Sequence, residues 1–168
     1  KFALLYRYNY ELSDVGDKFF KDIQRLFFKH YKLTSVNKAK GIYAELFLRN
    51  MQEYSDDEDD DKYIGESCGY AITLNSADQI KKYSHLFSDV DMIIFDEFQS
   101  ETNHYCSDEI KKFLSVHTSI ARGNGEQVRY VPVYMLSNTV SIINPYYVEM
   151  GISDRLRSDT KFLRGHGF

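Results

Sequence analysis

Residues 90–97 read VDMIIFDE, an apolar run that ends in two adjacent carboxylates, Asp96 and Glu97. The run is continuous rather than alternating, which predicts a strand buried on both faces of a sheet. Ligands of open α/β sheets bind beyond the carboxyl ends of the strands, and these carboxylates hold that position. The stretch therefore predicts a rigid strand that carries a polar site at its end.

Further apolar runs and helical patterns lie on both sides of this strand. Three runs predict strands: residues 2–8, 42–48 and 128–136. Apolar residues at spacings of three and four predict two amphipathic helices: residues 15–31 and 107–120. Buried strands that alternate with such helices favour a layered α/β domain.

Two glycines and a capping pattern predict the local structure just ahead of the VDMIIFDE strand. Residues 62–74 place Gly65 and Gly69 between two β-prone pieces, which predicts a β-hairpin with a short loop. The sequence SADQ matches a capping box, in which Ser76 and Gln79 satisfy each other's exposed amide groups. A short helix is expected to follow.

The composition is that of one globular domain with a mild negative charge. The chain has 168 residues, of which 43% are apolar, and its net charge is −4. This balance argues against a dedicated nucleic-acid-binding module, but it leaves room for a motor that touches DNA through a few local charges. Cys68 and Cys106 form no CxxC pair, so a reducing, cytoplasmic setting is expected. No segment approaches the length of a membrane span.

Two charged segments are expected to lie outside the core. The acidic run SDDEDDD occupies residues 55–61. A calcium loop of the helix–loop–helix type needs a central glycine at its sixth position, and counting from Asp56 that position is Asp61. Like charges repel one another, so this run is expected to be a solvated, mobile loop. The basic tail, residues 155–168, is expected to start a further strand or a linker.

An apolar strand that ends in Asp-Glu is the pattern of the Walker B element of nucleotide-hydrolysing motors. Asp96 could hold a magnesium ion through the ion's water shell. Glu97 could polarise the water that attacks a terminal phosphate. The alternative is simply a strand that ends in a charged turn.

A second polar cluster follows the apolar run at residues 128–136. It consists of Ser137, Asn138 and Thr139. Side chains at this edge of the sheet could detect whether the terminal phosphate is present. The alternative is a helix cap or a turn, which the same residue types favour.

Three stretches, in this order along the chain, carry a resemblance to a known family. They are FALLYRYNYEL at residues 2–12, SDVDMIIFDEF at 88–98 and VRYVPVYMLSNTVSIINPYY at 128–147. Together they resemble the DNA-encapsidation ATPases of small tailed bacteriophages, which are relatives of the terminase large subunits. The resemblance covers residues 2–147.

The resemblance implies a fold with one part missing. The implied fold is a partial P-loop NTPase (ASCE, RecA-like) domain with three layers, a mainly parallel sheet and a β-hairpin insertion. The family's phosphate-binding loop, GxxxxGK[ST], occurs nowhere in the 168 residues. The absence of the strand that carries this loop would leave a gap beside the strand at 128–136. Residues 1–168 are therefore expected to be a single ATPase-domain piece of a longer protein, with little or no nucleotide binding of its own.

The resemblance also implies roles for single residues. Asp96 would be the magnesium-associated carboxylate and Glu97 the catalytic glutamate. The motif that senses the phosphate and couples it to motion would be Ser137, Asn138 and Thr139.

Two arginines receive implied roles as well. Arg122 matches a candidate arginine finger, which completes the active site of the neighbouring subunit because its guanidinium spreads charge over phosphate oxygens. The alternatives are that Arg122 is a solvent-exposed loop arginine, or that Arg129 is the finger. Arg7 matches the strand-end arginine of the family, and it is expected either to lie near the nucleotide or to pair with Glu11.

The function implied for the intact protein is ATP hydrolysis that drives double-stranded DNA into the procapsid. The implied cofactors are ATP and Mg²⁺, and the implied partners are DNA, the portal and procapsid, and further copies in a homo-oligomeric ring. The implied location is the host cell cytoplasm at the assembling virion, with no membrane. The rival functions are a non-catalytic interaction module with a degenerate nucleotide fold, and another ASCE motor such as a helicase-like ATPase.

Overall fold

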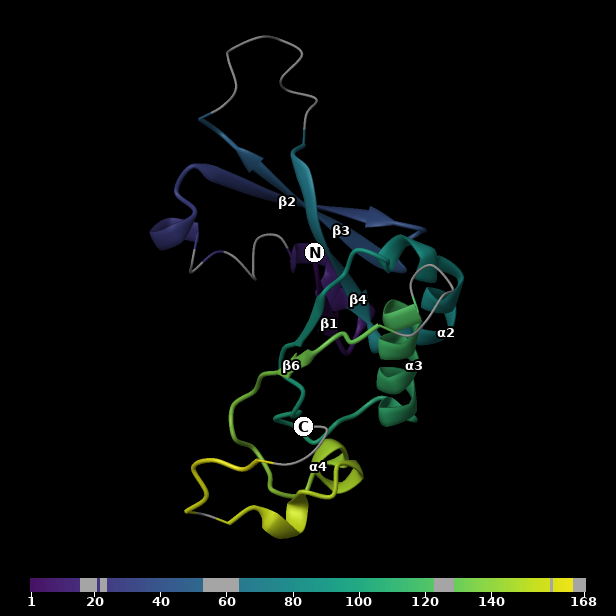
Figure 1. Ribbon diagram of the computed structural model, residues 1–168, viewed down its shortest axis with the longest axis vertical. Coiled ribbons are helices and arrows are strands. Elements are labelled where there is room, and N and C mark those ends of the chain that lie inside the picture. Colours follow the sequence, from purple (N-terminus) through teal and green to yellow (C-terminus); the bar gives the residue numbers. More distant parts are fainter. Residues whose placement is uncertain (16–20, 22–23, 53–63, 123–128, 158, 165–168) are drawn as a thin grey trace.

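A six-stranded sheet in the order β2-β3-β4-β1-β5-β6 forms the centre of the molecule (Figure 1). The computed structural model describes residues 1–15, 21, 24–52, 64–122, 129–157 and 159–164. The strands are β1 Phe2–Tyr6, β2 Tyr31–Lys38, β3 Tyr43–Asn50, β4 Glu66–Thr73, β5 Met92–Phe95 and β6 Val133–Met135. The α-helices are α2 Ala77–Ile80, α3 Glu109–Arg122 and α4 Pro145–Glu149. The 3₁₀ helices are η1 Asn9–Asp14, η3 Leu74–Ser76, η4 Lys81–Phe87 and η5 Ser153–Arg155.

Four strands of the sheet are parallel and two extend it in the antiparallel sense. Strand β1 pairs in parallel with both β4 and β5, and β5 pairs in parallel with β6. Strands β2 and β3 form an antiparallel pair that joins the sheet through β4. The predicted α/β class with a mainly parallel sheet is confirmed.

The register brings the carboxyl ends of three strands to one edge. Leu5 of β1 lies opposite Phe95 of β5, and Phe95 lies opposite Met135 of β6. The polar residues that follow these strands therefore emerge at the same level of the sheet.

Both faces of the sheet are covered by apolar side chains. Strands alternate their side chains between the faces, so Ala3 and Leu5 join the core on the side of α2, η4 and α3, while Leu4 joins the opposite one. Helix α3 contributes a buried stripe at spacings of three and four, which is formed by Phe113, Val116 and Ile120. Each such buried side chain contributes about 1.5–3 kcal/mol of hydrophobic stabilisation.

The opposite face is covered by a smaller apolar cluster. Leu12 and Val15, from η1 and the residue after it, pack against Leu4, Ala44 and Leu46 of the sheet. The central strands β1 and β4 are therefore enclosed on both sides, which explains why their apolar runs are continuous.

The hairpin predicted within residues 62–74 is wrong. Strand β4 runs through Gly69 without a turn, and residues 62 and 63 lie outside the described part of the chain. Gly69 is instead needed for close approach, because a Cβ atom there would lie 2.6 Å from the carbonyl oxygen of Phe2 in β1. The antiparallel pairs of this sheet are β2–β3 and β3–β4.

The helix predicted over residues 15–31 is only partly described, and of its described residues, 15, 21 and 24–27 are helical. Residues 16–20, 22 and 23 lie outside the described residues, and Tyr31 begins strand β2, which was not predicted. Leu26 and Phe27 are 70% and 75% exposed, so they form no buried stripe in this structure. The prediction of a mobile acidic loop at residues 55–61 also lies outside the described residues.

The capping box predicted at residues 76–79 is wrong as well. Helix α2 is present, but Ser76 makes no side-chain capping hydrogen bond. Its hydroxyl instead donates to Asn9 Oδ1 at 3.2 Å and accepts from Thr73. These bonds join the ends of β1 and β4, so the polar residues serve long-range packing rather than the helix start.

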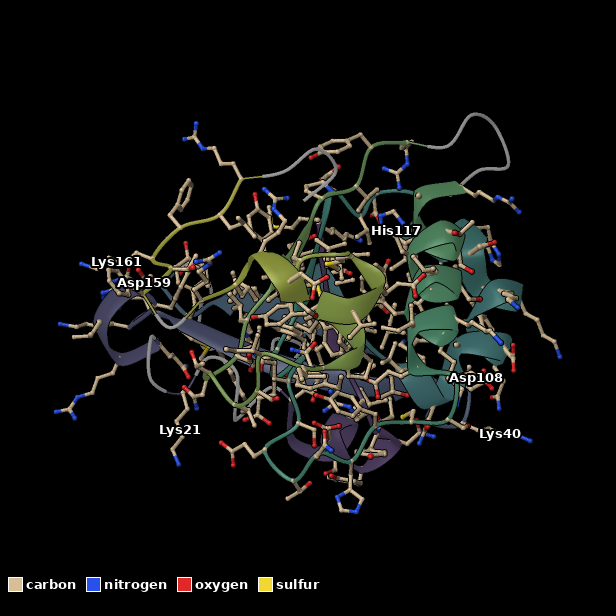
Figure 2. The ribbon with its side chains drawn as sticks, turned by 90° about the horizontal axis from the view of Figure 1, so that it is seen from below. Lys21, Lys40, Asp108, His117, Asp159 and Lys161 are labelled. Atoms are coloured by element: carbon tan, nitrogen blue, oxygen red, sulfur yellow. The ribbon has the colours of Figure 1, made fainter. Side chains whose placement is uncertain are left out.

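The remaining strands and helices agree with their predictions to within a few residues. Strand β3 confirms the run at 42–48, and β6 is a shorter version of the run at 128–136. Helix α3 confirms the pattern at 107–120, displaced by two residues. Figure 2 shows α3, marked by Asp108 and His117, across the molecule from Asp159 and Lys161 of the tail. The described tail residues 156, 157 and 159–164 contain no strand.

Candidate active site

The turn that follows β5 carries Asp96 and Glu97 at the carboxyl edge of the sheet. Arg7 follows β1 and Ser137 follows β6, so the register of the parallel strands brings all four residues to this edge. Asp96 is half-buried and Glu97 is exposed. The predicted polar position beyond the carboxyl ends of the strands agrees with this arrangement. The predicted burial of the VDMIIFDE strand on both faces is wrong, because only one face of β5 is fully buried: Ile93 and Phe95 are buried, whereas Met92 is exposed.

Glu97 adopts a backbone conformation that is uncommon for a residue with a side chain. Its φ is +52°, in the left-handed region. Asp96 Oδ1 accepts a hydrogen bond of 3.0 Å from the Glu97 amide, which stabilises this turn locally. Non-glycine residues hold such conformations only where the surroundings over-determine them, and they cluster at functional sites.

Arg7 lies beneath this turn and holds its backbone. The guanidinium Nη2 donates to Phe98 O at 2.8 Å and Nη1 donates to Glu97 O at 3.3 Å. Its Nε lies 3.1 and 2.9 Å from the two carboxylate oxygens of Glu109. The carboxylate that faces Arg7 is therefore Glu109, and not Glu11 as one of the two sequence alternatives had it.

Glu109 is the buried centre of this arrangement, with a side chain only 2% exposed. Its Oε1 accepts from Tyr146 Oη at 2.7 Å, and its Oε2 accepts from the Cys106 amide at 2.7 Å. Burial opposes the charge on Arg7, but the hydrogen bond and charge of Glu109 outweigh it and raise the pKa of Arg7. Burial, and then the charge of Glu109, raise the pKa of Tyr146.

Glu109 was not predicted as a site residue. From the sequence, Glu109 was interpreted as an acidic residue in the first turn of a helix, where its charge interacts favourably with the helix dipole. Its side-chain partners, Arg7 and Tyr146, are 102 and 37 positions away in the chain, so no local spacing could reveal them.

Other carboxylates gather near the same edge of the sheet. Burial, followed by the charges of Asp96, Glu11 and Glu97, raises the pKa of the Tyr6 phenol. Burial also raises the pKa of Glu11, and Glu97 adds to this, although a hydrogen bond from the Tyr8 amide and the charge of Arg7 oppose it. The edge therefore has a local excess of negative charge, which favours a bound cation.

Ser137 supplies a polar atom that has no partner in the described structure. Its hydroxyl oxygen is buried and forms no hydrogen bond with the described residues. Asn138 and Thr139 are exposed. Buried hydroxyl groups ordinarily find a partner, so an orphaned one at a candidate site fits a ligand oxygen or a water.

The residues present fit a magnesium ion that is held mostly by water and phosphate. In the described ranges, no group of three or more His, Cys, Asp or Glu side chains is arranged to hold a metal. Magnesium keeps several waters and is often bound through one or two carboxylates plus substrate phosphates. Asp96 could be such a carboxylate, and the excess of negative charge around it is compatible with this role.

Arg122 lies at the far end of α3 from this turn. Glu109 begins the helix and Arg122 ends it, and a rise of 1.5 Å per residue separates them by about 20 Å. The structure therefore does not bring Arg122 together with Asp96 and Glu97 of the same chain.

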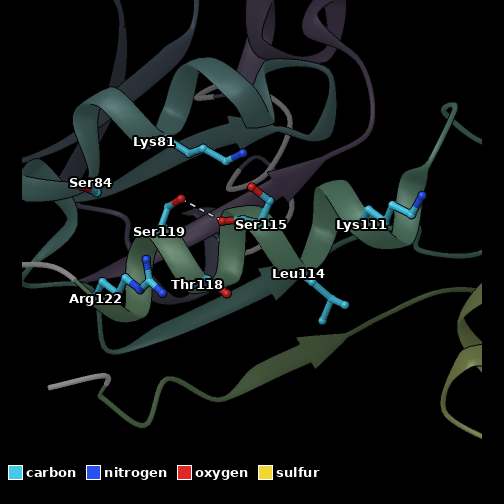
Figure 3. Close-up of a pocket in the computed structure, with 8 residues that line it drawn as sticks. All are labelled: Lys81, Ser84, Lys111, Leu114, Ser115, Thr118, Ser119 and Arg122. Carbon is cyan, nitrogen blue, oxygen red and sulfur yellow. Dashed lines mark hydrogen bonds between the residues drawn. The ribbon is translucent and has the colours of Figure 1, made fainter.

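A pocket of about 400 Å³ lies between η4 and α3, and Arg122, which is exposed, is one of the residues that line it (Figure 3). Its lining consists of three basic side chains, four hydroxyls and one leucine: Lys81, Ser84, Lys111, Leu114, Ser115, Thr118, Ser119 and Arg122. Lys81 and Lys111 also pair with exposed aspartates one helical turn earlier, Asp78 and Asp108, at 3.3 and 3.1 Å. The pocket combines positive charge with hydroxyl donors, which suits a phosphate.

Arg129, the alternative finger, is engaged in the fold. Its Nη2 donates to the carbonyl oxygens of Phe87 and Ile120, each at 3.2 Å. Ile120 lies in the last turn of α3, where a cation satisfies carbonyls that have no partner within the helix. Arg129 thus joins η4 to the end of α3 through these carbonyl oxygens, and no such bond of Arg122 is seen within the described residues.

The fold defines this chain as an α/β domain of the kind found in phage DNA packaging proteins. The crystal structure of the N-terminal domain of the DNA packaging ATPase from bacteriophage phi29 matches it with a TM-score of 0.56 and 24% identity, over 91% of this chain and 65% of that one. The chain belongs to the Podovirus DNA encapsidation protein (Gp16) family, whose sequence profile matches residues 1–158. The family resemblance of the three sequence stretches is confirmed.

Two relatives agree with this family. The DNA packaging protein of Bacillus phage phi29 is 30% identical over 150 residues, which are 88% of this chain and 36% of that protein. The DNA packaging protein of Bacillus phage B103 is 33% identical over 156 residues, which are 90% of this chain and 39% of that protein. The chain thus spans little more than a third of the length of these relatives. Among the described residues, none of the helices is long and apolar enough to span a bilayer.

Proposed function

We propose that this chain is part of the ATPase domain of a terminase-like motor that packages double-stranded viral DNA. The observation that carries the proposal is the turn at Asp96 and Glu97, which stands at the carboxyl edge of a parallel sheet on a buried Arg7–Glu109 pair. Phosphoryl transfer depends mainly on positioning and on charge stabilisation, so a rigidly mounted pair of carboxylates suits it.

The two carboxylates have different roles in this proposal. Asp96, which is half-buried and hydrogen-bonded to the next amide, holds Mg²⁺ through its water shell. Glu97, which is exposed, accepts the proton of the water that attacks the terminal phosphate of ATP. Bound Mg²⁺ neutralises charge on the phosphate oxygens. Ser137, Asn138 and Thr139 detect the terminal phosphate, and the orphaned hydroxyl of Ser137 is available for this contact.

Arg7 acts beneath the site in this proposal. Its side chain is 8% exposed and every nitrogen of the guanidinium donates to Glu97, Phe98 or Glu109. In this proposal it places the Glu97 turn, and the nucleotide-binding role that the sequence resemblance implied stays a prediction.

A phosphate-binding loop completes the domain in the intact protein. Strand β6 has β5 as its one neighbour in the described sheet, and Tyr134 and Leu136 beside its free edge are about half exposed. A strand that carries the loop would pair with this edge and place its amides beside Ser137. An unpaired apolar edge is otherwise a liability that proteins cover.

Arg122 serves the active site of a neighbouring copy. It lies about 20 Å along α3 from Glu109, so it is too distant to act on the site of its own chain. The pocket that it lines adds Lys81 and Lys111, and a cluster of cations can stabilise the charge that develops on a transferred phosphate. The proposed assembly is therefore a homo-oligomeric ring on the portal of the procapsid, in the host cytoplasm at the assembling virion.

The test uses the intact protein with Glu97→Gln and the matched control Glu101→Gln. Glu101 is exposed four residues further on and has no part in the proposed chemistry. Glu97→Gln should retain ATP binding and lower turnover by about 10²–10⁴-fold, the usual contribution of a general base. The control should match the wild-type protein. Full turnover in Glu97→Gln would overturn the assignment.

The second candidate is a non-catalytic interaction module with a degenerate nucleotide fold. It differs from the first candidate in whether the intact protein carries GxxxxGK[ST], a motif that does not occur in these 168 residues. Without the amides and lysine of that loop, this chain by itself should bind Mg-ATP weakly or not at all. Calorimetric titration with Mg-ATP distinguishes the two candidates. If the protein is a motor, the intact protein should bind Mg-ATP and this chain alone should not. If it is a degenerate module, neither should bind. A helicase-like motor would instead translocate DNA without a procapsid.

A further inference from the structure

Gln99 connects the two loops of the candidate site. It lies two residues after Glu97 and is only 5% exposed. Its Oε1 accepts from the amides of Val140 and Ser141 at 3.3 and 3.1 Å, and its Nε2 donates to Tyr147 Oη at 3.0 Å. Two backbone N–H donors require an acceptor, so the oxygen of the Gln99 amide must face them.

The bonds to the Val140 and Ser141 amides hold the C-terminal end of the loop at residues 137–139. The other end is fixed by the main chain around the acidic turn. Leu136 N donates to Phe95 O at 2.9 Å, and Phe98 N donates to Leu136 O at 3.2 Å. The loop between Leu136 and Val140 is therefore fastened at both ends to the segment that contains Asp96 and Glu97.

The side chains within this loop are left available. Asn138 and Thr139 are exposed, and the Ser137 hydroxyl has no partner among the described residues. The loop is thus held by its ends and by main-chain atoms, while its side chains have no hydrogen-bond partner in the described part of the chain. This arrangement suits a sensor that must respond to a ligand without detaching from the catalytic turn.

The chemistry of glutamine is specific at this position. A buried amide group that accepts two bonds and donates a third has nearly all of its capacity used. A methionine of similar shape offers no comparable acceptor, whereas a glutamate retains acceptor oxygens for the two amides. The substitution series Gln99→Met and Gln99→Glu therefore separates the hydrogen bonds from the volume of the side chain.

We propose that Gln99 is a positioning residue that couples the loop at residues 137–139 to the turn at Asp96 and Glu97. A shift of the loop on phosphate contact is transmitted through the Gln99 oxygen and the Phe98 amide to the backbone that carries Glu97. Gln99 contacts no reacting atom in this proposal. The inference rests on the proposed ATPase function of the intact protein.

The kinetic test compares variants of the intact protein. Gln99→Met should lower kcat by about tenfold, within the ordinary range of coupling between sites, with KM for ATP changed by less than about threefold, because transition-state placement and not ground-state binding is lost. Gln99→Glu should restore most of kcat. The matched control Tyr147→Phe removes only the partner of Nε2 and should keep wild-type kcat. Wild-type kcat in Gln99→Met would overturn the proposal, as would equal losses of kcat in Gln99→Met and Gln99→Glu.

A second measurement keeps the proposal testable if Gln99→Met does not fold. Hydrogen exchange in the unsubstituted intact protein compares the ADP-bound state with the state bound to a non-hydrolysable ATP analogue. Protection should change together at residues 96–100 and 137–141. A change confined to one of the two segments would overturn the coupling. Glu97→Gln serves as the reference: if it retains turnover, the ATPase proposal fails, and if only Gln99→Met retains turnover, the coupling fails alone.

Discussion

Arg7 and Glu109 form a buried ion pair at 2.9 Å beneath the Asp96–Glu97 turn, although 102 residues separate them in the chain. The pair joins the end of β1 to the start of α3, and Tyr146 of α4 adds a third element. Because Arg7 also donates to the carbonyls of Glu97 and Phe98, the same side chain that links these elements sets the backbone of the candidate catalytic residue.

Removing one partner of this pair should destabilise the fold strongly. Arg7→Met leaves a buried carboxylate without its cation, and such losses cost about 3–5 kcal/mol. Urea denaturation of the variant should show this fall in the free energy of unfolding. The double variant Arg7→Met with Glu109→Leu should recover part of the loss, since no charge remains buried.

The matched control for the ion pair lies one residue before Glu109. Asp108 pairs with Lys111 at 3.1 Å, but both side chains are largely exposed. Asp108→Asn should therefore cost no more than about 1 kcal/mol. If Arg7→Met proves as mild as Asp108→Asn, the buried pair does not organise the site.

The backbone conformation of Glu97 should lower the free energy of unfolding, because its positive φ favours a glycine at this position. Its φ of +52° is unfavourable for an L-residue by about 1–2 kcal/mol. Glu97→Gly should thus be more stable than Glu97→Ala by about 1 kcal/mol, while both variants of the intact protein lose turnover. Thermal denaturation of the two variants measures the difference, and a less stable Glu97→Gly would show that the left-handed backbone is not a source of strain.

The titration of Glu11 should make the stability of the fold depend on pH. Burial and the nearby Glu97 raise its pKa above 4.5 in the folded state, so the folded chain binds this proton more tightly than the unfolded chain does. The resulting stabilisation is fully present below pH 4.5 and is lost as the pH rises through the raised pKa. Glu11→Gln should flatten this decline, because glutamine keeps an acceptor for the Tyr8 amide and does not ionise in this range.

The comparison needs denaturation curves for both proteins at closely spaced pH values. The difference in free energy of unfolding between Glu11→Gln and the wild type isolates the contribution of this one group from all other titrations. A difference that does not change as the pH rises from about 4, near the ordinary pKa of a glutamate, would contradict the raised pKa.

Arg122 should be required by the neighbouring subunit and not by its own. In the intact protein, Arg122→Ala should lower turnover by about 10³-fold or more, as loss of an arginine finger does. Mixing these subunits with Glu97→Gln subunits should restore part of the activity, because each variant supplies what the other lacks. Arg122→Lys is the matched control, which keeps the charge but not the guanidinium fork. No recovery in mixed assemblies would argue against action between subunits.

The sequence predicted the location of the site better than the contacts that support it. Asp96 and Ser137 each follow an apolar run, and parallel strands end at the same edge, so their shared location could be inferred from pattern alone. Glu109 and Gln99 could not be found in this way. Apart from the Cys106 amide, their partners lie between 37 and 102 positions away, and no local periodicity records such pairs.

The errors in the fold have similar causes. Glycine is common in turns, so Gly69 indicated one, but here the lack of a side chain lets β4 approach β1 closely. Ser76 indicates a helix cap, but its hydroxyl bonds with Asn9 and Thr73 across the sheet edge. Strand β2 was missed because its sequence, YKLTSVNK, is only half-buried and therefore lacks a strong apolar run. In each case a tertiary contact decided between local conformations that the sequence alone permits.

Helix α3 connects two distant parts of the candidate site through one rigid element, so a small rotation at its first residue produces a larger displacement at its last residue. Its first residue, Glu109, is paired with the Arg7 side chain beneath the Asp96–Glu97 turn, and its last residue, Arg122, stands about 20 Å away. A tilt of about 5° around the Glu109 end would displace Arg122 by nearly 2 Å, given that length. A movement too small to break one hydrogen bond at the first end is thus large enough at the other to add or remove a contact of the Arg122 side chain.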